Sequence, residues 1–156
     1  MPKKKSIGII LLLLFLIWGA FNTLFRIFIR TDSTDTLLWK NYNLLWLGYL
    51  FALIILVLNI ASIVAIFKPQ KWGLKVLYAF FILNVAITLL TLLLGVFNID
   101  TLKDAVIQSR TSRGLSTEGI DSVVSPSVMT IISLLYVIFY ILLTFYVYKR
   151  KDYFSS

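Results

Sequence analysis

The sequence predicts an all-α membrane protein, in which four transmembrane helices form an up-down-up-down bundle. Hydrophobic residues make up 60% of the 156 positions and charged residues only 14%, which is far from the balance of a soluble domain. The charges gather between four long apolar runs, as they do in polytopic membrane proteins. Because about 20 apolar helical residues cross a hydrocarbon core of about 30 Å, each run is long enough to span. We therefore treat residues 1–156 as one four-helix transmembrane domain.

The first predicted span covers residues 6–29. The lysines at positions 3–5 resemble the basic start of a signal peptide, but the apolar run that follows is long. Trp18 also disfavours the small-residue pattern that a cleavage site before Phe21 would need. We therefore expect an uncleaved signal anchor.

The first outer loop, residues 30–42, leads into the second predicted span, residues 43–67. A short helical turn is expected over residues 36–40, with Trp39 dipping into the lipid headgroups. Trp46 lies at the same end of the span, and aromatic residues are common at membrane interfaces. The loop is therefore expected to lie on the membrane surface.

Residues 68–73 turn the chain back into the third predicted span, residues 74–98. Pro69 and Gly73 break helices within this short segment. The second and third spans must then form a tight antiparallel hairpin.

The second outer loop, residues 99–125, is the largest polar region of the sequence. Thr101 with Asp104 resembles a capping box, which indicates the start of a helix, and Gly114 is expected to end it. We predict a short interfacial helix here, lying on the outer leaflet.

The fourth predicted span covers residues 126–148. Ser125 is expected to be its N-cap residue, and Pro126 fits the first helical position because its missing N–H costs nothing there. Four crossings place both termini on the same side of the membrane.

The basic residues predict which side that is. Nine of the 15 flank the ends of the spans that share the side of the termini: Lys3, Lys4, Lys5, Lys68, Lys71, Lys75, Lys149, Arg150 and Lys151. The positive-inside rule then predicts a multi-pass protein of the cell membrane with both termini in the cytoplasm.

Small and polar side chains recur every three or four residues along each span, which places them on one face of each helix. Lipid penalises polar groups, so such a face is expected to point into the bundle. The polar members of this seam are Asn22, Arg26, Asn59, Ser62, Asn84, Thr88, Thr91, Ser133 and Tyr140. Gly48, Ala52 and Gly95 are expected to allow close helix packing.

In the central hairpin the seam residues pair so that their numbers add up to 143. This register predicts a hydrogen bond between Asn59 and Asn84 near the bilayer centre, and close backbones where Gly48 meets Gly95. The seam fits either packing between helices, which we favour, or a path for a solute. Arg26 is expected to reach the outer surface or to pair with Asp32, Asp35 or Asp100, and the less favoured alternatives are gating and anion binding.

The composition of the chain disfavours several classes of function. The chain has no Cys and no His, and its carboxylates are scattered over loops, so neither an enzyme nor a catalytic, metal or cofactor site is expected. Proton-coupled transport is disfavoured because no acid lies within a span. The net charge of +8 is explained by lipid headgroups and topology rather than by nucleic acid.

Two functional interpretations remain. We favour a non-enzymatic accessory, regulatory or immunity-type protein, which would act in the bilayer through another membrane protein or through copies of itself. The alternative is a passive channel or small-solute transporter that uses the Asn- and Thr-lined seam, as an oligomer.

Overall fold

The computed structural model describes residues 6–31 and 33–154, and every regular element within these ranges is a helix. Four of the helices are 22 to 27 residues long and apolar enough to cross a membrane: α1 (Ile7–Phe28), α3 (Leu45–Phe67), α4 (Lys71–Phe97) and α7 (Pro126–Lys149). The predicted all-α fold with four spanning helices packed as a bundle is therefore confirmed. The shorter elements are α2 (Thr34–Asn41), α5 (Ile99–Thr111), α6 (Ile120–Val123) and the 3₁₀ helix η1 (Lys151–Phe154).

The ends of these helices follow from local chemistry. The Ser125 hydroxyl accepts a hydrogen bond from the Val128 N–H at 3.3 Å, with Pro126 opening α7, as expected. The N-cap of α5 is Asn98, whose side chain accepts from the Thr101 N–H at 3.4 Å. The expected capping role of Thr101 is therefore wrong, because α5 starts directly after α4.

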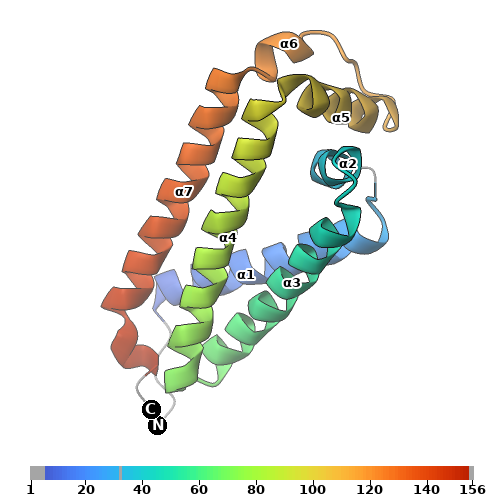
Figure 1. The fold of residues 1–156 in the computed structure, drawn as a ribbon. Coiled ribbons are helices and arrows are strands. Elements are labelled where there is room, and N and C mark those ends of the chain that lie inside the picture. The colour runs from blue at the N-terminus through green and yellow to red at the C-terminus, as the bar shows by residue number, and fades with distance from the viewer. Residues whose placement is uncertain (1–5, 32, 155–156) are drawn as a thin grey trace.

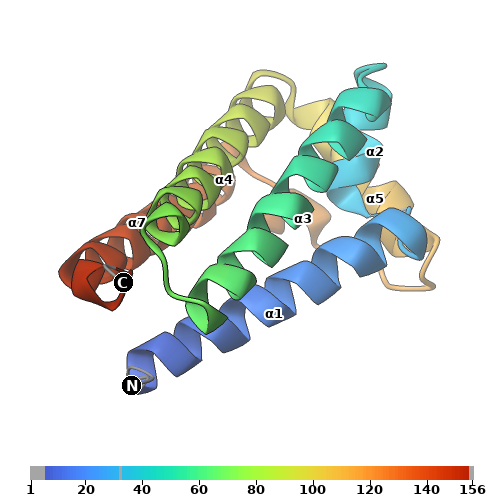
Figure 2. The ribbon, with the colours of Figure 1, turned by 90° about the horizontal axis from the view of Figure 1, so that it is seen from below.

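The spans run alternately up and down. The α3–α4 turn lies at the same end of the molecule as the start of α1 and the end of α7, and we call this the hairpin end (Figure 1). Helices α2, α5 and α6 lie at the opposite end, the loop end (Figure 1). Helix α3 packs against α1 and α4, and α4 packs against α7. Seen from below, α1 and α3 form one pair and α4 and α7 the other (Figure 2).

The two pairs are joined at the hairpin end and diverge toward the loop end (Figure 1). An apolar core closes the hairpin end, and η1 folds under it: the Tyr153 hydroxyl donates to the Ile66 carbonyl at 2.8 Å. The buried members of this core are Ile9, Leu12, Leu16, Ile66, Leu77, Phe80, Phe81, Val147 and Phe154. Burial of these apolar side chains holds the two helix pairs together at the hairpin end.

A second apolar cluster lies at the loop end, outside the four spans. It is formed by α2, α5, α6 and the residue after α6, through Leu37, Leu38, Leu102, Ala105, Ile120 and Val124. The half-buried Lys103 ammonium pairs with the exposed Asp121 carboxylate at 2.7 Å, and this hydrogen bond raises the pKa of Lys103. These short helices thus form a separate layer across the end of the bundle.

Two expectations, for Trp39 and for the glycine pair of the hairpin, are wrong. Trp39 is buried against α3 instead of dipping into headgroups: a Cβ added at Gly48 would lie 2.9 Å from the Trp39 ring. Gly48 and Gly95 do not bring α3 and α4 together, because the nearest neighbour of Gly95 is the Leu102 side chain. A close approach within the hairpin lies beside the turn, where a Cβ on Gly73 would be 2.6 Å from the Ala65 Cβ.

Candidate functional site

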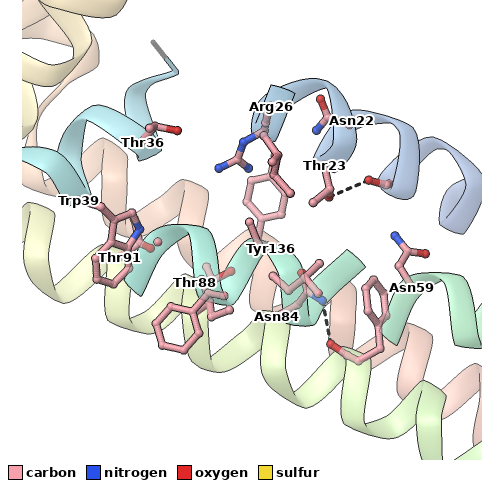
Figure 3. A pocket seen from close by; sticks show the side chains of 18 of the residues that line it. Asn22, Thr23, Arg26, Thr36, Trp39, Asn59, Asn84, Thr88, Thr91 and Tyr136 are labelled. Carbon is pink, nitrogen blue, oxygen red and sulfur yellow. Dashed lines mark hydrogen bonds between the residues drawn. The ribbon is translucent and has the colours of Figure 1, made fainter. Parts of the chain in front are cut away.

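A cavity of about 550 Å³ lies between the diverging helix pairs. All four spanning helices line it, and Thr36 and Trp39 of α2 border it at the loop end. Asn84, Thr88 and Thr91 of α4 lie opposite Thr23 and Arg26 of α1 (Figure 3). The volume is typical of a small-molecule site, about 300–1,000 Å³.

The mouth of the cavity lies between α1 and α7. These two helices touch toward the hairpin end, where the Phe15 and Phe139 ring centroids are 5.4 Å apart and the Ser6 and Tyr146 hydroxyls 3.3 Å. Farther along, the lining residues on both sides are exposed: Trp18 by 67% and Tyr136 by 56%. In a bilayer this edge of the bundle would face lipid, so the cavity opens sideways as well as toward the loop end.

A hydrogen bond joins α4 and α7 deep in the cavity. The Tyr140 hydroxyl donates to Asn84 Oδ1 at 3.2 Å. Asn84 Nδ2 in turn donates to the Phe80 carbonyl at 2.8 Å (Figure 3). The Asn84 amide is therefore held in one orientation. The edge-on contact of Phe15 with Tyr140, with centroids 6.4 Å apart, brings α1 against the same pair.

Asn59 is the most unusual polar residue of the cavity. It is only 1% exposed, and its Oδ1 has no hydrogen-bond partner among the described residues. The expected bond between Asn59 and Asn84 is therefore not formed, since Asn84 bonds to Tyr140 instead. A buried acceptor without a donor costs about 1–3 kcal/mol. Asn59 Oδ1 thus marks a place where a donor from a ligand or a water molecule would be stabilised.

Most of the seam identified in the sequence lies along this cavity. The lining includes ten of its members: Asn22, Arg26, Gly48, Ala52, Asn59, Asn84, Thr88, Thr91, Ser133 and Tyr140. Two members lie elsewhere. Ser62 is fully buried and donates to the Leu58 carbonyl at 2.7 Å, and Gly95 lies under α5. Of the acids expected near Arg26, Asp32 and the Asp35 side chain lie outside the described part of the structure.

Sequence reasoning missed several lining residues, among them Trp18, Thr23, Thr36 and Trp39. Thr23 gives no sequence signal for a cavity, because a threonine hydroxyl can bond to its own helix anywhere. Here it donates to the Gly19 carbonyl at 2.9 Å. Trp39 was expected to be an interfacial anchor. Thr36 and Trp39 belong to a loop helix whose position depends on tertiary packing.

The chemistry of this lining is that of a binding surface. Its polar side chains are amides, hydroxyls and one guanidinium, and aromatic and aliphatic side chains form the rest of the lining. Within residues 6–31 and 33–154, His, Cys, Asp and Glu form no group of three or more that could hold a metal ion. The cavity can therefore accept and donate hydrogen bonds to a ligand through neutral groups, with the positive charge of Arg26 at one side.

The fold and the cavity define the chain as a four-span integral membrane protein with a polar cavity between its helices. A comparison with protein-family models, curated proteins and solved structures finds no match to the chain. Its function is therefore argued from the site itself.

Proposed function

We propose that this protein is a non-enzymatic membrane protein that binds an amphipathic molecule between its two helix pairs, as part of transport across or within the bilayer. The polar part of the molecule would occupy the cavity, and its apolar part would extend between α1 and α7 into the lipid. This is the transport interpretation of the seam, with the ligand entering from the membrane.

One observation carries the proposal: most seam residues line an open cavity, although Asn84 and Tyr140 bond to each other. In a dry bundle, polar side chains in the membrane would pair across the helices. Here Asn59 Oδ1 is buried without a partner, and Thr88 and Ser133 lie along the cavity wall. Such a lining suits a ligand that brings its own donors and acceptors.

The apolar core at the hairpin end argues for a binding protein rather than an open channel. Leu16, Ile66 and Phe81 are each at most 1% exposed there, and a hydrophobic plug of this kind excludes ions and polar solutes. Passage to the other side of the membrane would therefore require the helix pairs to move relative to each other. Binding is the step that this arrangement supports.

Ligand binding in the cavity is tested by filling the cavity with a larger side chain. Ala52 lines the cavity, whereas its neighbour Leu53 is 53% exposed on the outside of α3. In native mass spectrometry from mild detergent, we expect the wild-type chain to retain one lipid-sized adduct. Ala52→Phe should lose the adduct and Leu53→Phe should keep it. A wild-type chain without an adduct, or equal retention by the two variants, would refute the proposal.

A second candidate is an interaction with another membrane protein or with a second copy of the chain. The observation that favours it is the exposure of α7, the least buried of the four spans. A single cysteine at Leu135, which is 61% exposed on α7, would crosslink in native membranes if copies meet there. A chain that stays monomeric under these conditions would argue against self-association through α7.

We also propose that both termini lie in the cytoplasm and that the loop end faces outward, as the distribution of basic residues predicts. Glu118 and Gln70 are exposed at opposite ends of the molecule. A membrane-impermeant thiol reagent should label Glu118→Cys on intact cells, and Gln70→Cys only after the cells are opened. The reverse pattern would invert the topology.

A further inference from the structure

We infer that a cluster of arginines at the loop end of the cavity binds a phosphate group of the ligand. This inference rests on the proposed function, because it names the polar part of the amphipathic molecule. The cluster was not among the sites expected from the sequence, apart from Arg26.

The arginines surround a second cavity, of about 290 Å³, beside the first. Arg26 and Arg30 come from the end of α1 and the residues after it, and Arg113 from the residues after α5. Polar side chains complete the lining: Asn22, Ser33, Thr34 and Ser109. Segments more than 80 positions apart in the sequence thus bring three positive charges to one small space.

Arg113 is held in position by α5. Its Nε donates to the Ser109 carbonyl and its Nη2 to Ser109 Oγ, both at 2.7 Å. Ser109 is fully buried, so it gives the guanidinium a fixed base. The remaining N–H groups of Arg113 stay available, because a guanidinium has five donors.

The charge of the cluster favours an anion. Three guanidinium groups line the cavity, and no carboxylate is among its described lining residues. The sequence places two acids nearby, Asp32 and Asp35. Even if both carboxylates faced the three arginines, one positive charge would remain in excess.

The geometry of the donors favours phosphate. A guanidinium presents parallel N–H groups that match two oxygens of a phosphate, which makes Arg the usual residue for this ligand. Serine and threonine hydroxyls next to the guanidinium groups supply further donors. A phosphate bound here would lie at the loop end, at the level where lipid headgroups meet water.

The two cavities are adjacent, since Asn22 and Arg26 line both of them. A single molecule can therefore place its phosphate among the arginines and a polar headgroup along the Asn- and Thr-lined wall. The opening between α1 and α7 leaves its apolar chains in the bilayer. A phospholipid combines these parts, whereas a soluble phosphate ester has only the polar ones.

The experiment measures binding of phosphatidylglycerol and of diacylglycerol to the delipidated full-length chain in detergent. The double variant Arg30→Gln/Arg113→Gln removes two exposed charges from the cluster. The control Lys68→Gln/Arg150→Gln removes two exposed charges from the hairpin end. We expect the first variant to bind phosphatidylglycerol about tenfold more weakly than the wild-type chain does. Its binding of diacylglycerol should be unchanged, and the control variant should bind both lipids as the wild-type chain does.

Equal binding of the two lipids by the wild-type chain, or an equal loss in the two double variants, would overturn phosphate recognition while leaving the binding cavity in place. A chain that binds neither lipid would instead contradict the proposed function. Glycerol 3-phosphate serves as the soluble competitor. If glycerol 3-phosphate displaces the lipid at a concentration equal to that of the lipid, phosphate recognition is supported and the site belongs to soluble esters. If it does not displace the lipid, the site belongs to the phospholipid.

Discussion

Asn59 and Asn84 have the same side chain but different surroundings. Asn84 accepts a hydrogen bond from the Tyr140 hydroxyl and donates one to the Phe80 carbonyl. Its amide therefore forms part of the contact between α4 and α7. Asn59 is buried with an unpartnered oxygen, next to Gly19, where a Cβ would lie 2.8 Å from Asn59 Nδ2. The first amide therefore stabilises the fold, and the second is available to a ligand.

Replacing Tyr140 by Phe should destabilise the protein. The change removes the hydroxyl that donates to Asn84 Oδ1, and interhelical hydrogen bonds in membranes contribute about 0.6–2 kcal/mol. We expect the free energy of unfolding, measured by denaturant titration in detergent, to fall by about 1 kcal/mol. The exposed Tyr136 provides the control, and Tyr136→Phe should have no measurable effect. Equal losses in the two variants would show that the bond contributes nothing.

Replacing Asn59 by Leu should separate stability from binding. Leu has a similar size and removes a buried acceptor that has no donor, so the free energy of unfolding should rise by about 1 kcal/mol or stay unchanged. The same variant should retain less ligand in native mass spectrometry. If Asn59→Leu destabilises the ligand-free protein by more than about 1 kcal/mol, Asn59 serves mainly the fold.

At the scale of helices, the hairpin of α3 and α4 is tight beside its turn and open at its other end (Figure 1). Gly73 lies close to Ala65 where the two backbones meet. Toward the loop end, Gly48 and Gly95 make room for side chains of α2 and α5 instead. The space beside these two glycines is thus occupied by side chains of α2 and α5, whereas in a closed hairpin α3 and α4 would contact each other there.

Gly73→Ala should therefore cost more stability than Gly95→Ala. A Cβ at Gly73 would lie 2.6 Å from the Ala65 Cβ, beside the α3 backbone, and overpacking of this kind costs about 1–3 kcal/mol. A Cβ at Gly95 would lie 3.0 Å from the flexible end of Leu102, which can move aside. Thermal unfolding of both variants in detergent compares the two positions. A larger loss in Gly95→Ala would contradict the described packing.

The sequence was sufficient to predict the four spanning helices. Long apolar runs specify spanning helices because lipid leaves the backbone no other partner, and Ser125 with Pro126 signals the start of α7. The neighbours of each helix were harder to predict. A small residue such as Gly48 permits close approach without specifying what approaches, so the contact with Trp39 could not be read from spacing.

For the whole molecule, an apolar core closes the hairpin end, a layer of short helices partly covers the loop end, and the cavity lies between them. The sequence identified the residues of the seam, because polar side chains in a membrane helix must face protein or a cavity. It did not distinguish a dry seam from an open one, since both need the same residues. Nor did it predict the arginine cluster, which depends on how α5 folds back toward α1.

The central claim, that the seam lines an open cavity, is tested most directly by thiol accessibility, since the chain has no cysteine of its own. Thr88 lines the cavity, Ser62 is buried outside it and Leu53 faces outward from α3. We expect a water-soluble, membrane-impermeant thiol reagent, applied from the loop end to the protein in liposomes, to modify Thr88→Cys and to leave Ser62→Cys and Leu53→Cys unmodified. A Thr88→Cys variant as unreactive as Ser62→Cys would mean that the seam is dry packing, and the account would be wrong.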